Sequence, residues 1–114
     1  MKWQYRLSPD AFADLTALDG SQQKQVLKAL DKLMLNPLPQ AEGGYGSPLG
    51  NKGGVDLTGF LKIKLRGAGL RIVYKLVKID GAAYVIIIGA RESEQVYREA
   101  KRRMEAFEYW YDSL

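Results

Sequence analysis

Three short apolar segments that follow one another in the second half of the chain constrain the fold most. Residues 60–66 alternate strictly between apolar and polar side chains, and residues 70–79 and 82–89 are rich in Val, Ile and Tyr. The segments are separated only by turn residues at 67–69 and 80–81, which is typical of neighbouring antiparallel strands. The sequence therefore predicts an antiparallel meander. Its last strand is apolar on both faces, so we expect it to lie centrally and covered.

The N-terminal part predicts one more strand and two helices. Residues 2–7 alternate in polarity, as a half-buried strand does. Ser8 is suited to cap a helix that has Pro9 in its first position. We expect Gly20 to end this helix and Ser21 to start a second one, which completes a helix hairpin. The second helix has an apolar stripe made by Val26, Leu27, Leu30, Leu33 and Met34.

A third helix is expected after Ser93, a suitable cap, because apolar residues then recur at spacings of three and four: Val96, Ala100, Met104, Phe107 and Tyr111. The predicted order is β-α-α-β-β-β-α. This is an α+β fold in which the helix hairpin and the C-terminal helix pack on a small, mainly antiparallel four-stranded sheet. At 114 residues the chain is expected to be a single domain, residues 1–114. Residues 37–57 are rich in Gly and Pro and predict a loop, either functional or disordered, with no phosphate-binding glycine spacing.

Two residue types are absent, and their absence limits the possible chemistry. The chain has no histidine and no cysteine, which excludes histidine-based nucleophile activation, cysteine nucleophiles and the common zinc sites. Any catalysis must use Lys, Arg, Tyr, Asp or Glu. The sequence shows no signal peptide and no apolar stretch of bilayer length, so we expect a cytoplasmic location.

Positive charge is concentrated in the meander. The net charge of the chain is +4, but residues 61–78 carry six cations and no acid: Lys62, Lys64, Arg66, Arg71, Lys75 and Lys78. Such a field attracts nucleic acid or an acidic protein. A solvated surface that only maintains solubility would have the same composition.

The alternation of the first meander strand places Lys62, Lys64 and Arg66 on one face. Matching the apolar faces of the first two strands sets Lys64 opposite Arg71, whereas a register shifted by two residues sets Arg66 opposite Arg71. Like charges directly opposite each other destabilise a sheet. This arrangement therefore indicates a surface that binds an anionic ligand.

Two further residues are candidates to border the same patch. Arg91 ends the last strand of the meander, and Tyr97 lies in the first turns of the final helix. A tyrosine in the apolar stripe of a helix is more often a core residue than a catalytic one. Tyr97 therefore has both interpretations.

The run from residue 61 to 74 reads K-x-K-L-R-x4-R-I-V-Y, and Gly89 then opens a second motif, G-x-R-x5-Y. In combination these motifs resemble the RelE toxins of bacterial toxin–antitoxin systems, with a close match over about residues 60–104. The resemblance implies a ribosome-dependent endoribonuclease that cuts mRNA in the ribosomal A site, and a cognate antitoxin as partner. The family's functional positions correspond to six residues that this chain retains: Lys62, Lys64, Arg66, Arg71, Arg91 and Tyr97. The chain differs from the family at Leu61 and Leu70, where an aromatic is common, and at Ala90, where a basic residue is common.

RNA can be cut without a metal or cofactor when its own 2′-hydroxyl attacks the adjacent phosphate. The reaction needs a base, positive charge at the phosphate and an acid for the leaving 5′-oxygen. A lysine can act as the base only while it is neutral, a state that neighbouring cations favour. The hypothesis assigns the base to Lys64, with Lys62 as the alternative, and the phosphate to Arg71 and Arg66. The acid, or a group that orients the target base, is then Arg91 or Tyr97.

Two other functions fit the same residues. A related toxin of the ParE kind, which inhibits DNA gyrase, would need binding residues but no acid–base set. A non-catalytic module could use the basic face to bind an acidic peptide or RNA. The aromatic tail formed by Phe107, Tyr109, Trp110 and Tyr111 is either an antitoxin-docking surface or ordinary packing on the sheet.

Overall fold

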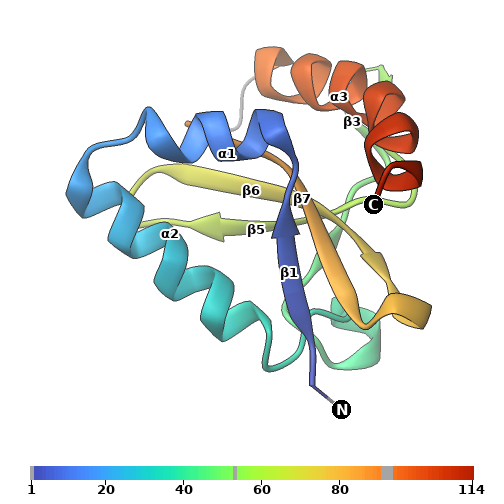
Figure 1. Ribbon diagram of the computed structural model, residues 1–114, viewed down its shortest axis with the longest axis horizontal. Helices are drawn as coiled ribbons and strands as arrows, with labels where there is room; N and C mark the ends of the chain where they lie inside the picture. Colours follow the sequence, from blue (N-terminus) through green and yellow to red (C-terminus); the bar gives the residue numbers. More distant parts are fainter. Residues whose placement is uncertain (1, 53, 91–93) are drawn as a thin grey trace.

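A five-stranded mixed sheet lies at the centre of the computed structural model, which describes residues 2–52, 54–90 and 94–114 (Figure 1). The strand order is β1-β7-β6-β5-β2, where the strands are β1 (Gln4–Leu7), β2 (Ser47–Pro48), β5 (Leu61–Leu65), β6 (Leu70–Val77) and β7 (Ala82–Ala90). β1 runs parallel to β7, and the other neighbours are antiparallel. The predicted α+β fold and mainly antiparallel sheet are confirmed. The sheet has one strand more than expected, because the short β2 extends it beyond β5.

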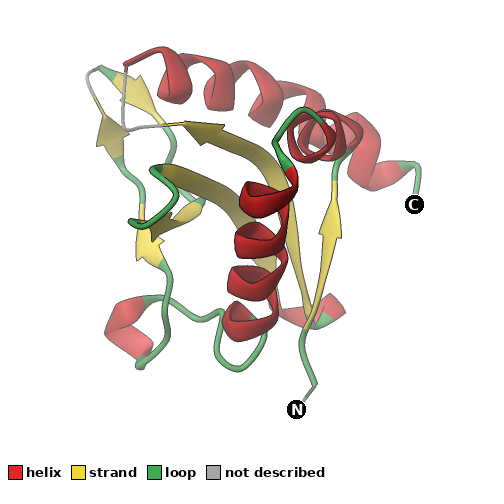
Figure 2. Cartoon of the chain, turned by 90° about the vertical axis from the view of Figure 1, so that its left-hand side faces the viewer, coloured by secondary structure: helices red, strands yellow, loops and turns green. Residues whose placement is uncertain are grey.

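Helices cover both faces of the sheet (Figures 1 and 2). The helices α1 (Pro9–Thr16) and α2 (Gly20–Leu33) contribute Ala11, Leu15, Val26, Leu30 and Leu33 to one buried cluster. α3 (Glu94–Asp112) contributes Val96, Tyr97, Ala100 and Phe107 to a second cluster. In the part of the chain that the structure describes, no helix is both long and apolar enough to cross a membrane.

The starts of the first two helices follow from their capping residues. Ser8 accepts a hydrogen bond from the Ala11 amide at 3.2 Å, as predicted. The prediction that Gly20 ends the first helix is wrong, since α1 ends at Thr16 and Gly20 is the first residue of α2. Asp19 caps α2 instead, in a reciprocal capping box with Gln22.

The central position predicted for the last meander strand is confirmed, because β7 lies between β1 and β6 and is buried from Ala82 to Ile88. A bulge interrupts its pairing with β6, where Val73 faces Ile87 and the next residue of β6 faces Val85. Ile86 is therefore an extra residue, and both Ile86 and Ile87 pack in the α3 cluster. Alternation along β7 supplies apolar side chains to both cores, and the bulge places two successive residues in the same one.

The aromatic tail of α3 packs mainly on the sheet. The ring of Tyr84 on β7 lies 5.6 Å from that of Trp110 and 5.2 Å from that of Tyr111, both edge to face. Phe107 stacks on Tyr111 with centroids 5.5 Å apart. Tyr109 alone is turned outward, with 84% of its surface exposed. Ordinary packing therefore explains three of the four tail aromatics.

The segment expected as a loop, residues 37–57, contains no long element but is closely folded. It includes a 3-10 helix η1 (Gln40–Glu42), the strand β2 and a small two-stranded ladder of β3 (Asn51–Lys52) and β4 (Val55–Asp56). The buried hydroxyl of Tyr74 donates to the Pro37 carbonyl at 2.9 Å. This bond ties the start of the segment to β6.

Candidate active site

The β5–β6 hairpin positions the central pair of the candidate site. The two strands pair in the register that sets Lys64 opposite Arg71, the first of the two registers predicted. On its other side Arg71 is paired with Gly89 of β7. Lys64 is exposed and Arg71 is half-buried. Two like charges therefore share one row of the sheet, and their repulsion favours the binding of an anion beside them.

Lys62 lies on the same face as Lys64 but in a different environment. It is opposite Val73, which belongs to the core beneath α3, and only 4% of its surface is exposed. Its Nζ donates to the Tyr97 hydroxyl at 3.1 Å and lies 5.7 Å from the centroid of that ring. The predicted face is correct, but α3 covers Lys62, so the accessible patch consists of the exposed Lys64 and Arg66 and the half-buried Arg71.

Tyr97 is a core residue, one of the two interpretations that the sequence left open, and it also contacts Lys62. It is 6% exposed and packs in the α3 cluster, as a core residue does. Its hydroxyl also meets Lys62 next to the cationic row. This hydrogen bond therefore joins the core beneath α3 to the edge of the candidate site. Arg91 and the predicted cap Ser93 lie outside the described residues.

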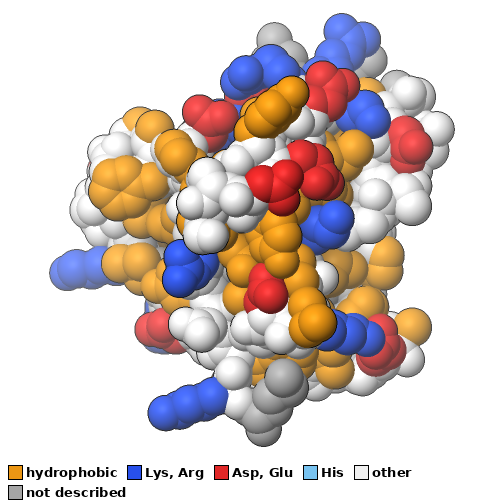
Figure 3. All heavy atoms as spheres, turned by 45° about the vertical axis from the view of Figure 1, so that its right-hand side comes forward, with side chains coloured by type: hydrophobic (Ala, Val, Ile, Leu, Met, Phe, Trp, Pro, Cys, Tyr) orange, Lys and Arg blue, Asp and Glu red, His pale blue; other side chains and the backbone are white. Residues whose placement is uncertain are grey.

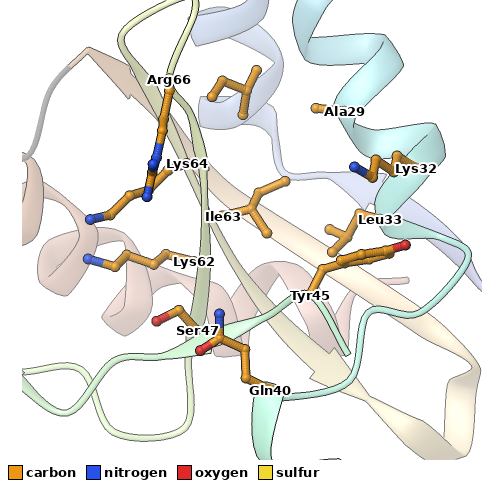
Figure 4. Close-up of a pocket in the computed structure, with 11 residues that line it drawn as sticks. Ala29, Lys32, Leu33, Gln40, Tyr45, Ser47, Lys62, Ile63, Lys64 and Arg66 are labelled. Carbon is orange, nitrogen blue, oxygen red and sulfur yellow. The ribbon is translucent and has the colours of Figure 1, made fainter. Parts of the chain in front are cut away.

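Lys75 of β6 lies apart from the cations of β5. Lys64 and Arg66 leave β5 on the same side as Lys62, whereas Ile63 points to the opposite side, toward α2 (Figure 4). Lys75 lies apart, with its Nζ 5.8 Å from the ring centroid of Phe60 and 5.6 Å from that of Phe107. Lys75 therefore belongs to the aromatic core beneath α3 and not to the candidate site.

An ion pair that the sequence analysis missed fixes α3 over the sheet. Arg103 of α3 donates to both carboxylate oxygens of Asp14 of α1, at 2.5 and 3.1 Å, and to the Ile86 carbonyl at 3.0 Å. Asp14 also accepts from the Ile88 amide at 3.0 Å. β1 pairs with β7 only as far as Val85. The Asp14–Arg103 ion pair therefore satisfies the backbone groups of Ile86 and Ile88, which lie beyond the end of β1.

Glu99 extends this ion pair into a small network on α3. It accepts from Arg102 at 2.6 Å and from Arg103 at 2.6 Å. The hydrogen bond from Arg102, supported by Arg103, lowers the pKa of Glu99 to about 2 against the opposing effect of burial. The network holds the helix that carries Tyr97, so it supports the candidate site without belonging to it. No local pattern indicates it, because Asp14 and Arg103 are 89 residues apart.

Metal ligands do not gather in the described ranges. Across residues 2–52, 54–90 and 94–114, no group of three or more Asp or Glu side chains is arranged to hold a metal ion. Among the described residues, the candidate site consists of two lysines, two arginines and one tyrosine: Lys62, Lys64, Arg66, Arg71 and Tyr97.

Relatives of known identity share most of the chain, although no protein-family model matches it. A RelE-like toxin protein of Escherichia coli is 33% identical over 108 residues, which cover 91% of this chain and 99% of the relative. The chain belongs to the RelE toxin family. The mRNA interferase toxin RelE of Escherichia coli K12 is 30% identical over 94 residues, which cover 82% of this chain and 88% of that toxin.

Solved structures of RelE agree with this assignment. A double arginine-to-alanine mutant of the Escherichia coli RelE toxin in the free state superposes with a TM-score of 0.70 at 27% identity, over 90% of this chain and 98% of that one. The same mutant in complex with a peptide of the antitoxin RelB gives a TM-score of 0.64 at 27% identity, over 88% of this chain and 95% of that one. The RelE resemblance drawn from the two sequence motifs is confirmed.

Proposed function

We propose that this protein is the toxin of a type II toxin–antitoxin pair and cuts mRNA on the ribosome. The observation that carries the proposal is the cationic row of Lys64 and Arg71 beside the buried Lys62–Tyr97 pair. A relative that is 30% identical over most of both chains is named mRNA interferase toxin RelE, which supports RNA as the substrate.

The reaction needs only groups that the chain and its substrate supply. Lys64, as the general base, takes the proton of the 2′-hydroxyl as that oxygen attacks the adjacent phosphorus. The bond from phosphorus to the 5′-oxygen breaks, which leaves a 2′,3′-cyclic phosphate and a 5′-hydroxyl. Arg71 and Arg66 stabilise the additional negative charge on the phosphate, a task suited to permanently charged, fork-shaped guanidinium groups.

The leaving 5′-oxygen needs a proton, and the proposed donor is Tyr97. Its hydroxyl oxygen accepts a hydrogen bond from Lys62 Nζ at 3.1 Å. A positive charge beside that oxygen stabilises the phenolate that forms when the proton leaves. Lys62 therefore acts on the proton donor, while Lys64 acts as the base. Arg91 is the alternative donor that the family motif provides.

A weak base and a buried acid explain why a ribosome would be required. Holding a reactive group in the correct position can remove a large part of the activation free energy of a reaction. A ribosome that holds the mRNA in the geometry for in-line attack would supply that positioning. We therefore expect little cleavage of free RNA, and we place the protein in the cytoplasm, where ribosomes are available.

A cognate antitoxin is the expected protein partner. The Escherichia coli RelE toxin has been solved with a peptide of its antitoxin RelB, and that toxin chain superposes on this one with a TM-score of 0.64. By analogy, an antitoxin encoded beside this toxin would suppress its activity.

Three variants test the roles on ribosomes that carry a defined mRNA. We expect Lys64→Ala and Arg71→Ala each to reduce cleavage by about 100-fold or more, because each removes a group needed only in the transition state. Lys64→Arg should be as inactive as Lys64→Ala, since arginine stays protonated. Lys24→Ala, which removes an exposed lysine of α2, is the matched control and should keep full activity.

The competing functions give different results. If Lys64→Arg kept full activity, the basic face would be a binding surface without a general base. Intact mRNA together with inhibited DNA gyrase would replace the proposal with a ParE-like activity.

A further inference from the structure

A groove of about 400 Å³ runs along the edge of β5, between that strand and α2 (Figure 4). β2 pairs with β5 only at Leu61 and Lys62, so the edge from Ile63 onward faces the groove. Apolar side chains of α2 and β5 line its base, and polar side chains line its rim. The rim consists of Lys32, Gln40, Tyr45, Ser47, Lys64 and Arg66, and the buried Lys62 also lines the groove.

The charges around this groove all have one sign. Four cations line it, and none of the described residues that line it is acidic. On the face of the molecule seen in Figure 3, by contrast, acidic and basic side chains lie side by side. Three of the four cations, Lys62, Lys64 and Arg66, also belong to the candidate active site. Their side chains leave β5 on the side away from Ile63 and α2 (Figure 4), so this positive charge lies where the groove meets the candidate site and would attract an anionic ligand to that edge.

The glycine-rich segment holds Tyr45 at the rim. Tyr45 lies between Gly44 and Gly46, where an added Cβ would collide with the Leu38 carbonyl and the Tyr74 hydroxyl respectively. The Tyr45 amide donates to the Asn36 carbonyl at 3.1 Å, and the Gly46 amide donates to the Leu38 carbonyl at 3.0 Å. The backbone that carries the ring is thus fixed before any ligand binds.

The Tyr45 ring is accessible and polarised by a cation. It is 45% exposed, and Lys32 Nζ lies 5.4 Å from its centroid. Proteins bind single-stranded nucleic acid by stacking bases on aromatic rings beside a cationic groove. The Gln40 amide and the Ser47 hydroxyl at the same rim can hydrogen-bond to the edge of a base.

We propose that this groove binds one unpaired nucleotide of the mRNA next to the cleavage point, with its base stacked on Tyr45 and its phosphate at the β5 cations. The inference rests on the proposed function, since it takes the substrate of the candidate site as RNA. The volume suits a single nucleotide and not a longer stretch of chain. The RNA strand would cross the edge of β5 between the groove and the row formed by Lys64 and Arg71.

Binding of a short, uncleavable 2′-O-methyl RNA to the isolated protein tests the groove directly. Tyr45→Leu keeps an apolar side chain but removes the ring, so we expect affinity to fall by about 5-fold to 100-fold. Tyr109→Leu removes an exposed tyrosine of α3 and should change affinity by less than about twofold. Lys32→Gln should reduce the slope of log affinity against log salt by about 0.7, and the control Lys24→Gln by less.

The binding assay needs no cleavage. A failure of the groove inference can therefore be told apart from a failure of the proposed function. RNA affinity that Tyr45→Leu leaves unchanged would overturn the inference even if mRNA is still cut on ribosomes. A polyglutamate peptide whose binding depends on Tyr45, while RNA binding does not, would also overturn it in favour of a protein ligand. On ribosomes, 4-thiouridine placed beside the cut should crosslink less to Tyr45→Leu than to the unaltered protein. A 4-thiouridine crosslink that Tyr45→Leu leaves unchanged would overturn the assignment to mRNA.

Discussion

Replacing Arg103 with methionine should loosen the docking of α3 on the rest of the fold. The substitution keeps a long apolar side chain and removes the guanidinium that joins α3 to Asp14 of α1 and to the Ile86 carbonyl of β7. The Asp14 side chain, only 20% exposed, is then left without its ion-pair partner. The neighbouring Arg102 provides a matched control, because its side chain is 64% exposed and it bonds to Glu99 alone among the described contacts.

The expected loss of folding stability for each variant follows from how exposed its ion pair is. Removing one partner of a fully buried pair costs about 3–5 kcal/mol. Because the Arg103 and Asp14 side chains are 12% and 20% exposed, we expect about 2–3 kcal/mol for Arg103→Met. For a domain of this size that corresponds to a fall in Tm of about 8–12 °C. Arg102→Met should cost no more than about 0.5 kcal/mol, or about 2 °C.

Thermal unfolding followed by circular dichroism at pH 7 would measure both variants against the unaltered protein. Cleavage on ribosomes, at a temperature where all three proteins are folded, would then show whether looser docking of α3 also displaces Tyr97. Equal melting temperatures for Arg103→Met and Arg102→Met would refute the conclusion that the Asp14–Arg103 pair fixes the helix.

Three further predictions concern Tyr97, Tyr74 and Glu99. Tyr97→Phe should reduce ribosomal cleavage by about 100-fold or more while the protein stays folded, because it removes the proposed proton donor; unchanged cleavage would assign the proton transfer to another group. Tyr74→Phe should lower the free energy of unfolding by about 1–2 kcal/mol, since it removes the buried bond to the Pro37 carbonyl, and amide exchange near Gly46 should become faster. The pKa of Glu99 is about 2 in the folded protein, below its ordinary 4.5, so its contribution to stability is complete above pH 4.5 and is lost as the pH falls toward 2. Glu99→Gln should therefore flatten the decrease of Tm over that range, and an identical pH profile would contradict the ion network on α3.

Local patterns predicted the meander well because register is fixed by matching apolar faces. Leu65 and Leu70 pair as expected, and this pairing brings Lys64 opposite Arg71. Gly20 was misjudged because glycine is tolerated both after a helix and in its first turn. The better signal was Asp19 followed three residues later by Gln22, the sequence signature of a capping box.

The short strands within residues 37–57 could not be predicted from periodicity. β2, β3 and β4 have two residues each, too few for an alternating pattern to appear. Their positions depend on tertiary partners such as β5, to which β2 pairs. The closely folded backbone around Tyr45 is indicated by sequence only through the flanking glycines.

For the candidate site, the sequence predicted which side chains share a face but not how deeply each is buried. A period of two places Lys62 and Lys64 together, yet it carries no information about α3, which covers Lys62 and leaves Lys64 exposed. The same limit applies to the Asp14–Arg103 pair, because contacts between distant segments depend on how the layers are arranged. Burial of Lys62 against Tyr97 is the feature that connects the cationic row to the proposed proton donor.

The central claim is that the row of Lys64 and Arg71 cuts mRNA through the 2′-hydroxyl of the substrate. Mapping the 5′ and 3′ ends of an mRNA after exposure to the protein on translating ribosomes tests it most directly. We predict cuts within the codon in the A site, with a 2′,3′-cyclic phosphate on the upstream fragment and a 5′-hydroxyl on the downstream one, and no cuts with Arg71→Ala. An mRNA left intact, or fragments ending in a 5′-phosphate, would contradict this mechanism.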